Sequence, residues 1–190
     1  MKKLFTLVFT VILICNLGIN FYQYKRLVHS YNVVADKFIF QLDKAKQSAE
    51  GIQKTIDESQ LSLYADDLWY APDHIADYGS LLDSMVQNST SYKSILSHVG
   101  TDLANFTLDV WSKNGLKQPI RSGNNPLPSP VDTAKLKEVY TIFRNHFTDS
   151  IIRHTDYEKQ RQALLDAHQE IKSKGLDQLL KNPTMFDMGM

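Results

Sequence analysis

The chain has 190 residues, of which 43% are hydrophobic, and its 21 basic residues balance its 21 acidic residues. This length suffices for one sizeable domain and an additional segment. The neutral charge balance gives no electrostatic reason to expect nucleic acid or an acidic substrate as a partner. Glycine and proline are scarce, at 8 and 6 residues, which is typical of a helical protein with few loops.

Residues 1–23 are predicted to form a transmembrane signal-anchor helix. Lys2 and Lys3 precede an apolar run, and the segment from Leu4 to Tyr22 would span roughly 28 Å as a helix, close to the hydrocarbon thickness of a bilayer. Aromatic and basic side chains follow at the depth of the headgroups, namely Phe21, Tyr22, Tyr24, Lys25 and Arg26. We therefore expect a single-pass protein of the cell membrane, with a cytoplasmic N-terminus and an extracytoplasmic remainder.

Two alternatives concern Cys15, the only cysteine of the chain. Cleavage of a signal peptide requires small residues before the cut, and Asn16 and Leu17 fit that pattern poorly. Lipid attachment requires a small residue directly before the cysteine, where this chain has Ile14. We expect the anchor to be retained, and the cysteine-free remainder must then be held by packing without disulfides.

Three amide side chains favour an association of the anchor helix. Asn16, Asn20 and Gln23 are spaced i, i+4 and i+7, so they share one face of the helix. Amides that face lipid are unfavourable, and hydrogen bonds between helices relieve this by roughly 0.6–2 kcal/mol per contact. The predicted partner is a second copy or another membrane protein. Alternatively, Asn20 and Gln23 already lie at the polar interface.

Residues 24–175 are predicted to form a long antiparallel helical bundle. Apolar residues recur with alternating spacings of four and three residues, which is typical of coiled coils and bundles. The first series is Tyr24, Val28, Tyr31, Ala35, Phe38, Leu42, Ala45, Ala49, Ile52, Ile56, Ser59 and Leu63. The second is Ile75, Tyr78, Leu82, Met85, Ser89, Tyr92, Leu96, Val99, Leu103, Phe106 and Val110.

A third helix is indicated by its ends. Ser129, Pro130 and Asp132 form an N-terminal capping pattern, and Gly175 follows the predicted end as a C-cap. The resulting fold is all-α, a three-helix coiled-coil-like bundle with helices at 24–65, 73–113 and 130–173 and a tail at 176–190. A break near Gly100 or Ser89 would give a four-helix bundle instead.

The connection at 66–72 is expected at the tip farthest from the membrane, and the connection at 114–131 near the membrane. The tip would carry an acidic and aromatic surface for a partner, made of Asp66, Asp67, Trp69, Tyr70 and Asp73. One alternative is that these residues begin a helix and plug the end of the bundle. Another is a metal site at Asp73, His74 and Asp77, although the spacing lacks the pattern of a calcium loop.

The middle of the bundle offers a candidate small-molecule site. Ser89 and Tyr92 on the second helix would face His154, Tyr157 and Arg161 on the third. A buried Arg161 would require an anion such as a bound carboxylate. The alternative is that Arg161 points outward into solvent.

Two function classes follow, since no catalytic motif, cofactor-binding motif or zinc-type histidine spacing occurs in the sequence. The first is a membrane-anchored, non-catalytic interaction or scaffold protein of the cell envelope. The second is an extracytoplasmic ligand-sensing bundle that signals through a separate membrane partner. We expect no enzymatic activity, no cofactor and no bound metal.

Overall fold

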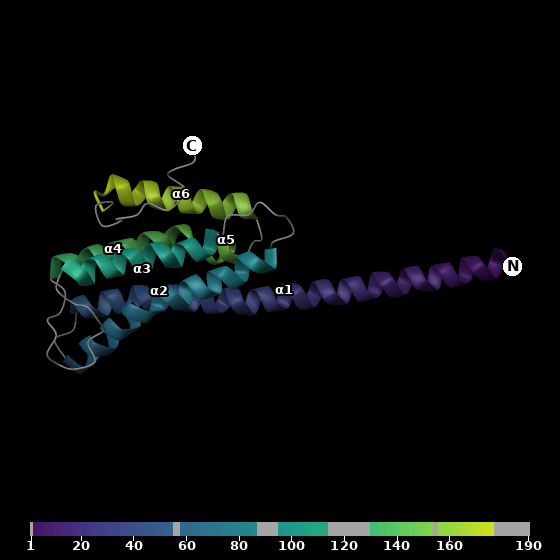
Figure 1. Ribbon diagram of the computed structural model, residues 1–190, viewed down its shortest axis with the longest axis horizontal. Helices are drawn as coiled ribbons and strands as arrows, with labels where there is room; N and C mark the ends of the chain where they lie inside the picture. The colour runs from purple at the N-terminus through teal and green to yellow at the C-terminus, as the bar shows by residue number, and fades with distance from the viewer. Residues whose placement is uncertain (1, 55–57, 87–94, 114–129, 154–155, 177–190) are drawn as a thin grey trace.

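The computed structural model describes residues 2–54, 58–86, 95–113, 130–153 and 156–176, which form six helices and no strand. The predicted all-α class is therefore confirmed. The helices are α1 (Lys2–Lys54), α2 (Glu58–Val86), α3 (Ile95–Lys113), α4 (Pro130–His146), α5 (Asp149–Arg153) and α6 (Tyr157–Ser173) (Figure 1).

The prediction that a connection lies at 66–72 is wrong. α1 ends at Lys54, and α2 continues through 66–72 with Pro72 in its interior. Proline removes a backbone hydrogen bond and costs a helix roughly 3 kcal/mol. The cost is offset by packing, because one stripe of α2 stays buried across the proline. Its buried members are Leu61, Ala65, Leu68, Pro72, Ile75 and Leu82.

The predicted second helix is divided into α2 and α3, and the interval between them contains Ser89, one of the two places proposed for a break. The two helices pack closely enough to require glycine. A Cβ atom added to Gly100 would lie 2.1 Å from the backbone nitrogen of Ala76. The Asp83 side chain accepts hydrogen bonds from the backbone N–H groups of Leu96 and Ser97, at 3.2 and 3.0 Å, and so caps the start of α3.

The predicted third helix has the expected ends but is interrupted in the middle. α4 begins at Pro130 and α6 ends at Ser173, and Gly175 has the positive φ of 66° that suits a helix C-cap. α4 ends at His146, where the Arg144 guanidinium donates to the backbone oxygen of Phe147 at 3.0 Å. The short helix α5 then precedes α6.

Successive long helices run antiparallel, with α6 packed on the outside of α3 and α4 (Figure 1). The ends of α1 and α2 meet where Gly51 lies against the Tyr64 ring. Tyr31, near the point where α1 leaves the bundle, donates a hydrogen bond to the backbone oxygen of Ile152 at 2.8 Å. α3 therefore ends, and α4 begins, at the bundle end farthest from the projecting part of α1 (Figure 1). The expectation that the 114–131 connection returns to the membrane end does not agree with this arrangement.

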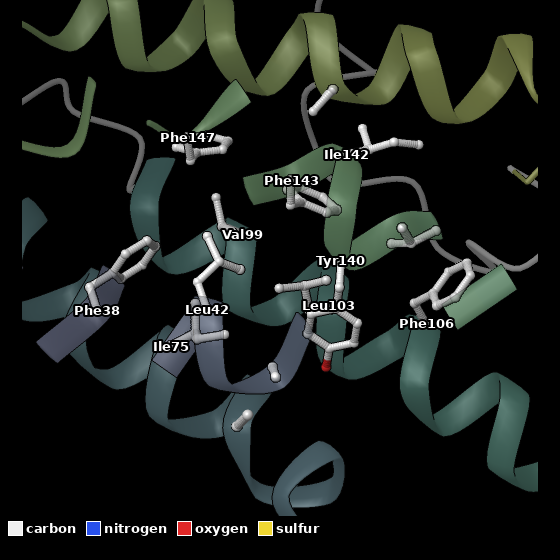
Figure 2. Packing of buried hydrophobic residues seen from close by; sticks show 14 of the residues in the cluster. Phe38, Leu42, Ile75, Val99, Leu103, Phe106, Tyr140, Ile142, Phe143 and Phe147 are labelled. Atoms are coloured by element: carbon white, nitrogen blue, oxygen red, sulfur yellow. The ribbon is translucent and has the colours of Figure 1, made fainter. Parts of the chain in front are cut away.

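A single apolar core joins all the helices (Figure 2). The largest fully buried side chains come from α1, α2, α3 and α4 and from Phe147, directly after α4, and include Tyr140, Phe38, Phe106, Phe143, Leu42, Leu68 and Ile75. Phe143 also meets the His168 ring of α6 edge-on, with ring centroids 6.2 Å apart. Burial of these apolar side chains, aliphatic and aromatic, is the main favourable contribution to the stability of the bundle.

Candidate functional site

The N-terminal part of α1 projects beyond the bundle as a single helix (Figure 1). Every residue from 8 to 29 is exposed. The large apolar side chains among them are Val8, Phe9, Val11, Ile12, Leu13, Ile14, Leu17, Ile19, Phe21, Tyr22, Tyr24, Leu27 and Val28. Successive residues of a helix point about 100° apart, so these apolar side chains project in all directions around the helix axis. Such a segment cannot be covered by packing one stripe against a bundle.

The three amides predicted for helix association lie on this projecting segment. Asn16, Asn20 and Gln23 are all exposed. The Asn16 side chain donates a hydrogen bond to the backbone oxygen of Ile12, in the preceding turn of its own helix, at 2.9 Å. This bond satisfies one of its two N–H donors within α1 and lowers the cost of placing the amide in an apolar environment.

Within the described residues, no helix combines the length and apolarity expected of a membrane-spanning segment. The same residues contain no group of three or more potential metal-binding side chains.

The predicted partner surface lies along α2, where its five residues point in different directions. The Asp67 carboxylate accepts hydrogen bonds from Lys44 at 2.6 Å and from Ser48 at 3.2 Å, so it serves the contact with α1. Trp69 packs against the core. Asp66 is half-buried, while Tyr70 and Asp73 are exposed. The structure therefore leaves Tyr70 and Asp73 on the outer surface and commits Asp67 and Trp69 to internal contacts.

The residues predicted for a small-molecule site are only partly described. Ser89, Tyr92 and His154 lie outside the described residues. Tyr157 is half-buried beside the core, and the Arg161 guanidinium lies 3.6 Å from the Glu158 carboxylate in the preceding turn of α6. Arg161 therefore has an anion within its own helix, which removes the reason for expecting a bound carboxylate.

Two buried polar pairs that sequence reasoning did not assign join α3 to the C-terminal helices. The ring Nε2 of His168 lies 2.7 Å from the carboxylate of Asp102, which is 1% exposed. The hydroxyl groups of Thr107 and Tyr140 lie 3.1 Å apart, and burial raises the pKa of Tyr140. Both pairs satisfy buried polar groups, and their surroundings are apolar side chains of the core. No local sequence signal marks these pairs, because their members lie 66 and 33 positions apart in the chain.

A third polar cluster fixes the C-terminal helices to α1. The Arg144 guanidinium lies 2.5 Å from Asp43 of α1 and 2.7 Å from Asp149 of α5. Burial acts to lower the pKa of Arg144, and the two carboxylates outweigh it, so the pKa is raised. Arg153 of α5 forms a further ion pair with Asp36. The contact of Arg144 with Asp43 is partly buried, the pairs at Asp149 and Arg153 are exposed, and together they link α1 to α4 and α5.

Comparisons with protein-family models, curated proteins and solved structures give no match for this chain.

Proposed function

We propose that the chain is a membrane-anchored, non-catalytic interaction or scaffold protein of the cell envelope. The observation that supports this is the projecting segment of α1, which is exposed from Val8 to Val28 and carries large apolar side chains around its whole circumference. In water, apolar surface of this extent is strongly unfavourable. A bilayer would cover it, and Leu4–Leu7 extend the apolar sequence toward the length that a span requires.

The proposal includes an orientation, with the N-terminus in the cytoplasm and the bundle outside it. Lys2 and Lys3 precede the span and Lys25 and Arg26 follow it, so the flanking side-chain charges are equal and by themselves favour neither orientation. Exposed Asn20 and Gln23 would lie near the outer interface, where they can pair with a second copy or another membrane protein. The bundle then stands on the membrane as a rigid module, because its interior is filled by packed side chains.

The test is retention of the full chain in membranes after a wash at alkaline pH. Wild-type protein is expected to stay with the membrane fraction. Replacing Ile12 and Leu13 with aspartate places two charges near the middle of the proposed span, at a cost of roughly 2.5–3.5 kcal/mol each. We expect this variant to leave the membrane fraction or fail to insert.

The matched control carries the same two charges on the exposed surface of the bundle. Val33 and Leu108 are 42% and 50% exposed, and their replacement with aspartate should leave retention unchanged. Circular dichroism of all three proteins checks that the bundle is folded. Wild-type protein that is released by the wash, or equal release of both variants, would overturn the proposal.

A further inference from the structure

One side of α2 faces outward along most of its length. Leu63, Tyr70, His74, Asp77 and Leu81 are spaced i, i+7, i+11, i+14 and i+18, so they share one side of the helix, and all five are exposed. This stripe runs for roughly 27 Å. Leu63 is 65% exposed and Leu81 is 47% exposed. We call this stripe, together with the exposed Asp73 at its edge, the α2 outer face.

The α2 outer face is not needed for packing within the bundle. The opposite side of α2 supplies the buried stripe, and Gly79 lies against the backbone of α3. Phe40 of α1, which is 62% exposed, extends the apolar surface across the neighbouring seam. It lies one turn from Lys37 and Lys44, which contact α2 at Tyr78 and Asp67. A long helix face with several exposed apolar side chains is typical of a helix-binding surface.

The charge of α2 indicates what kind of partner this face accepts. The helix contains six acidic residues and no lysine or arginine. Asp67 and Asp83 are used in contacts with α1 and α3. Asp77 lies within the α2 outer face and Asp73 at its edge, and neither forms an ion pair with any residue that the structure describes. Their charges are therefore available to an approaching molecule.

We propose that the α2 outer face docks a cationic amphipathic helix from a different protein. Apolar side chains of that helix would cover Leu63, Tyr70 and Leu81, while its lysine or arginine residues pair with Asp73 and Asp77. A second copy of this chain is disfavoured, because joining two such faces sets acid against acid. An anionic lipid surface is disfavoured for the same reason.

This inference rests on the proposed role of the bundle as an interaction module and names its partner class. The full chain is titrated, in uncharged detergent micelles, against a fluorescent helical peptide of leucine and lysine that is about 18 residues long, the length of the face. Binding to empty micelles is subtracted. We expect saturable binding that weakens with salt, and no binding of the same peptide with glutamate in place of lysine.

Two variants test the two parts of the face. Asp73→Asn with Asp77→Asn should weaken binding about tenfold or more, and Leu63→Ser with Leu81→Ser should weaken it similarly, since all four side chains are exposed. The matched control, Glu158→Gln with Asp166→Asn, removes the same charge from α6. It should change binding by less than about twofold.

Absence of saturable binding to the wild type would overturn the inference, as would equal weakening by the α2 and α6 charge variants. Neither result depends on attachment to a membrane, because the assay uses micelles. Failure of this inference is therefore distinguishable from failure of the proposed anchor, which the alkaline wash measures.

Discussion

The two parts of α1 differ in the exposure of their apolar residues: the part within the bundle buries most of them, and the projecting part leaves them exposed. From Tyr31 to Ala49, most buried residues follow the four-three spacing of one stripe, which Ile39 and Ser48 widen; the stripe is formed by Tyr31, Ala35, Phe38, Leu42, Ala45 and Ala49. From Val8 to Val28, apolar side chains occur on every side and all remain exposed. One continuous helix thus carries two patterns. Neighbouring helices can cover a single apolar stripe. Apolar side chains that project in all directions from a helix are covered only by an apolar environment all around it.

The largest expected effect distinguishes the buried stripe of α1 from its outer side. Phe38 is fully buried and Phe40 is 62% exposed, although they lie two residues apart. Phe38→Ala should lower the free energy of unfolding by roughly 3–5 kcal/mol, because it leaves a cavity between α1 and its neighbours. Phe40→Ala should change it by less than about 0.5 kcal/mol. Urea unfolding followed by circular dichroism measures both, and similar losses would contradict the assigned packing.

A smaller change in stability is expected when a glycine of the bundle and a glycine of the projecting helix are each replaced with alanine. A Cβ atom at Gly100 would lie 2.1 Å from the backbone nitrogen of Ala76, whereas one at Gly18 meets nothing within 4 Å. Gly100→Ala should therefore destabilise the bundle by roughly 1–3 kcal/mol, since two backbones must move apart. Gly18→Ala should cost nothing, and it removes a glycine penalty of up to about 1 kcal/mol in helix propensity.

Thermal unfolding of the two glycine variants in the same micelles provides the measurement. A lower melting temperature for Gly18→Ala than for Gly100→Ala would mean that the projecting helix is covered by a close partner and that α2 and α3 are not in close contact.

The smallest expected effect concerns a charge at the rim of the bundle. Glu170 accepts a hydrogen bond from His146 at 2.8 Å and pairs with Lys174, and these contacts lower the pKa of Glu170 below its ordinary value of 4.5. The resulting stabilisation is present above pH 4.5 and is lost as the pH falls through the lowered pKa. It is small, because the carboxylate is about a third exposed and therefore screened by solvent.

The pH profile of the free energy of unfolding is measured between about pH 3 and pH 7, a range that includes the ordinary pKa of a glutamate. The free energy should fall less steeply toward low pH in Glu170→Gln than in the wild type. Glu158→Gln should leave the profile unchanged, because Glu158 is 75% exposed and pairs only with Arg161 in its own helix. An identical profile for wild-type protein and the Glu170 variant would show that the contact between α4 and α6 adds no pH-dependent stability.

Much of the core could be predicted from the sequence, because apolar spacing reports directly which residues are buried. The buried residues Phe38, Leu42, Leu96, Leu103 and Phe106 all belong to the predicted series. The helix ends at Pro130, Ser173 and Lys113 were also predicted, because each is accompanied by capping residues or cations in the sequence.

The interior helix breaks were harder to predict, because an apolar series can continue in phase across a change of helix. The first predicted series included Leu63, which is 65% exposed, while the buried stripe of α2 begins at Leu61. The predicted series therefore does not continue in phase from α1 into α2. The second helix was predicted to begin at residue 73, directly after Pro72, because proline is favoured at helix starts; in the structure α2 continues through Pro72, and packing on both sides of it overrides that local preference.

The candidate sites were predicted less well, because side-chain direction depends on helix phase. Once α2 is one helix, Asp67 turns toward Lys44 and Tyr70 turns outward. Long-range pairs such as Asp102 with His168 join residues 66 positions apart. No local pattern specifies such a pair, so it could be found only after α6 had been placed on α3.

The uninterrupted course of α1 from Lys2 to Lys54 also has a mechanical consequence. Backbone hydrogen bonds along a helix resist twisting, so the projecting segment is a torsionally stiff rod that is continuous with the bundle. In the part of α1 that lies within the bundle, Tyr31 and Asp36 contact α5 and Asp43 contacts α4. A rotation of the projecting segment about its axis therefore turns the whole bundle, and with it the direction in which α2 faces its surroundings.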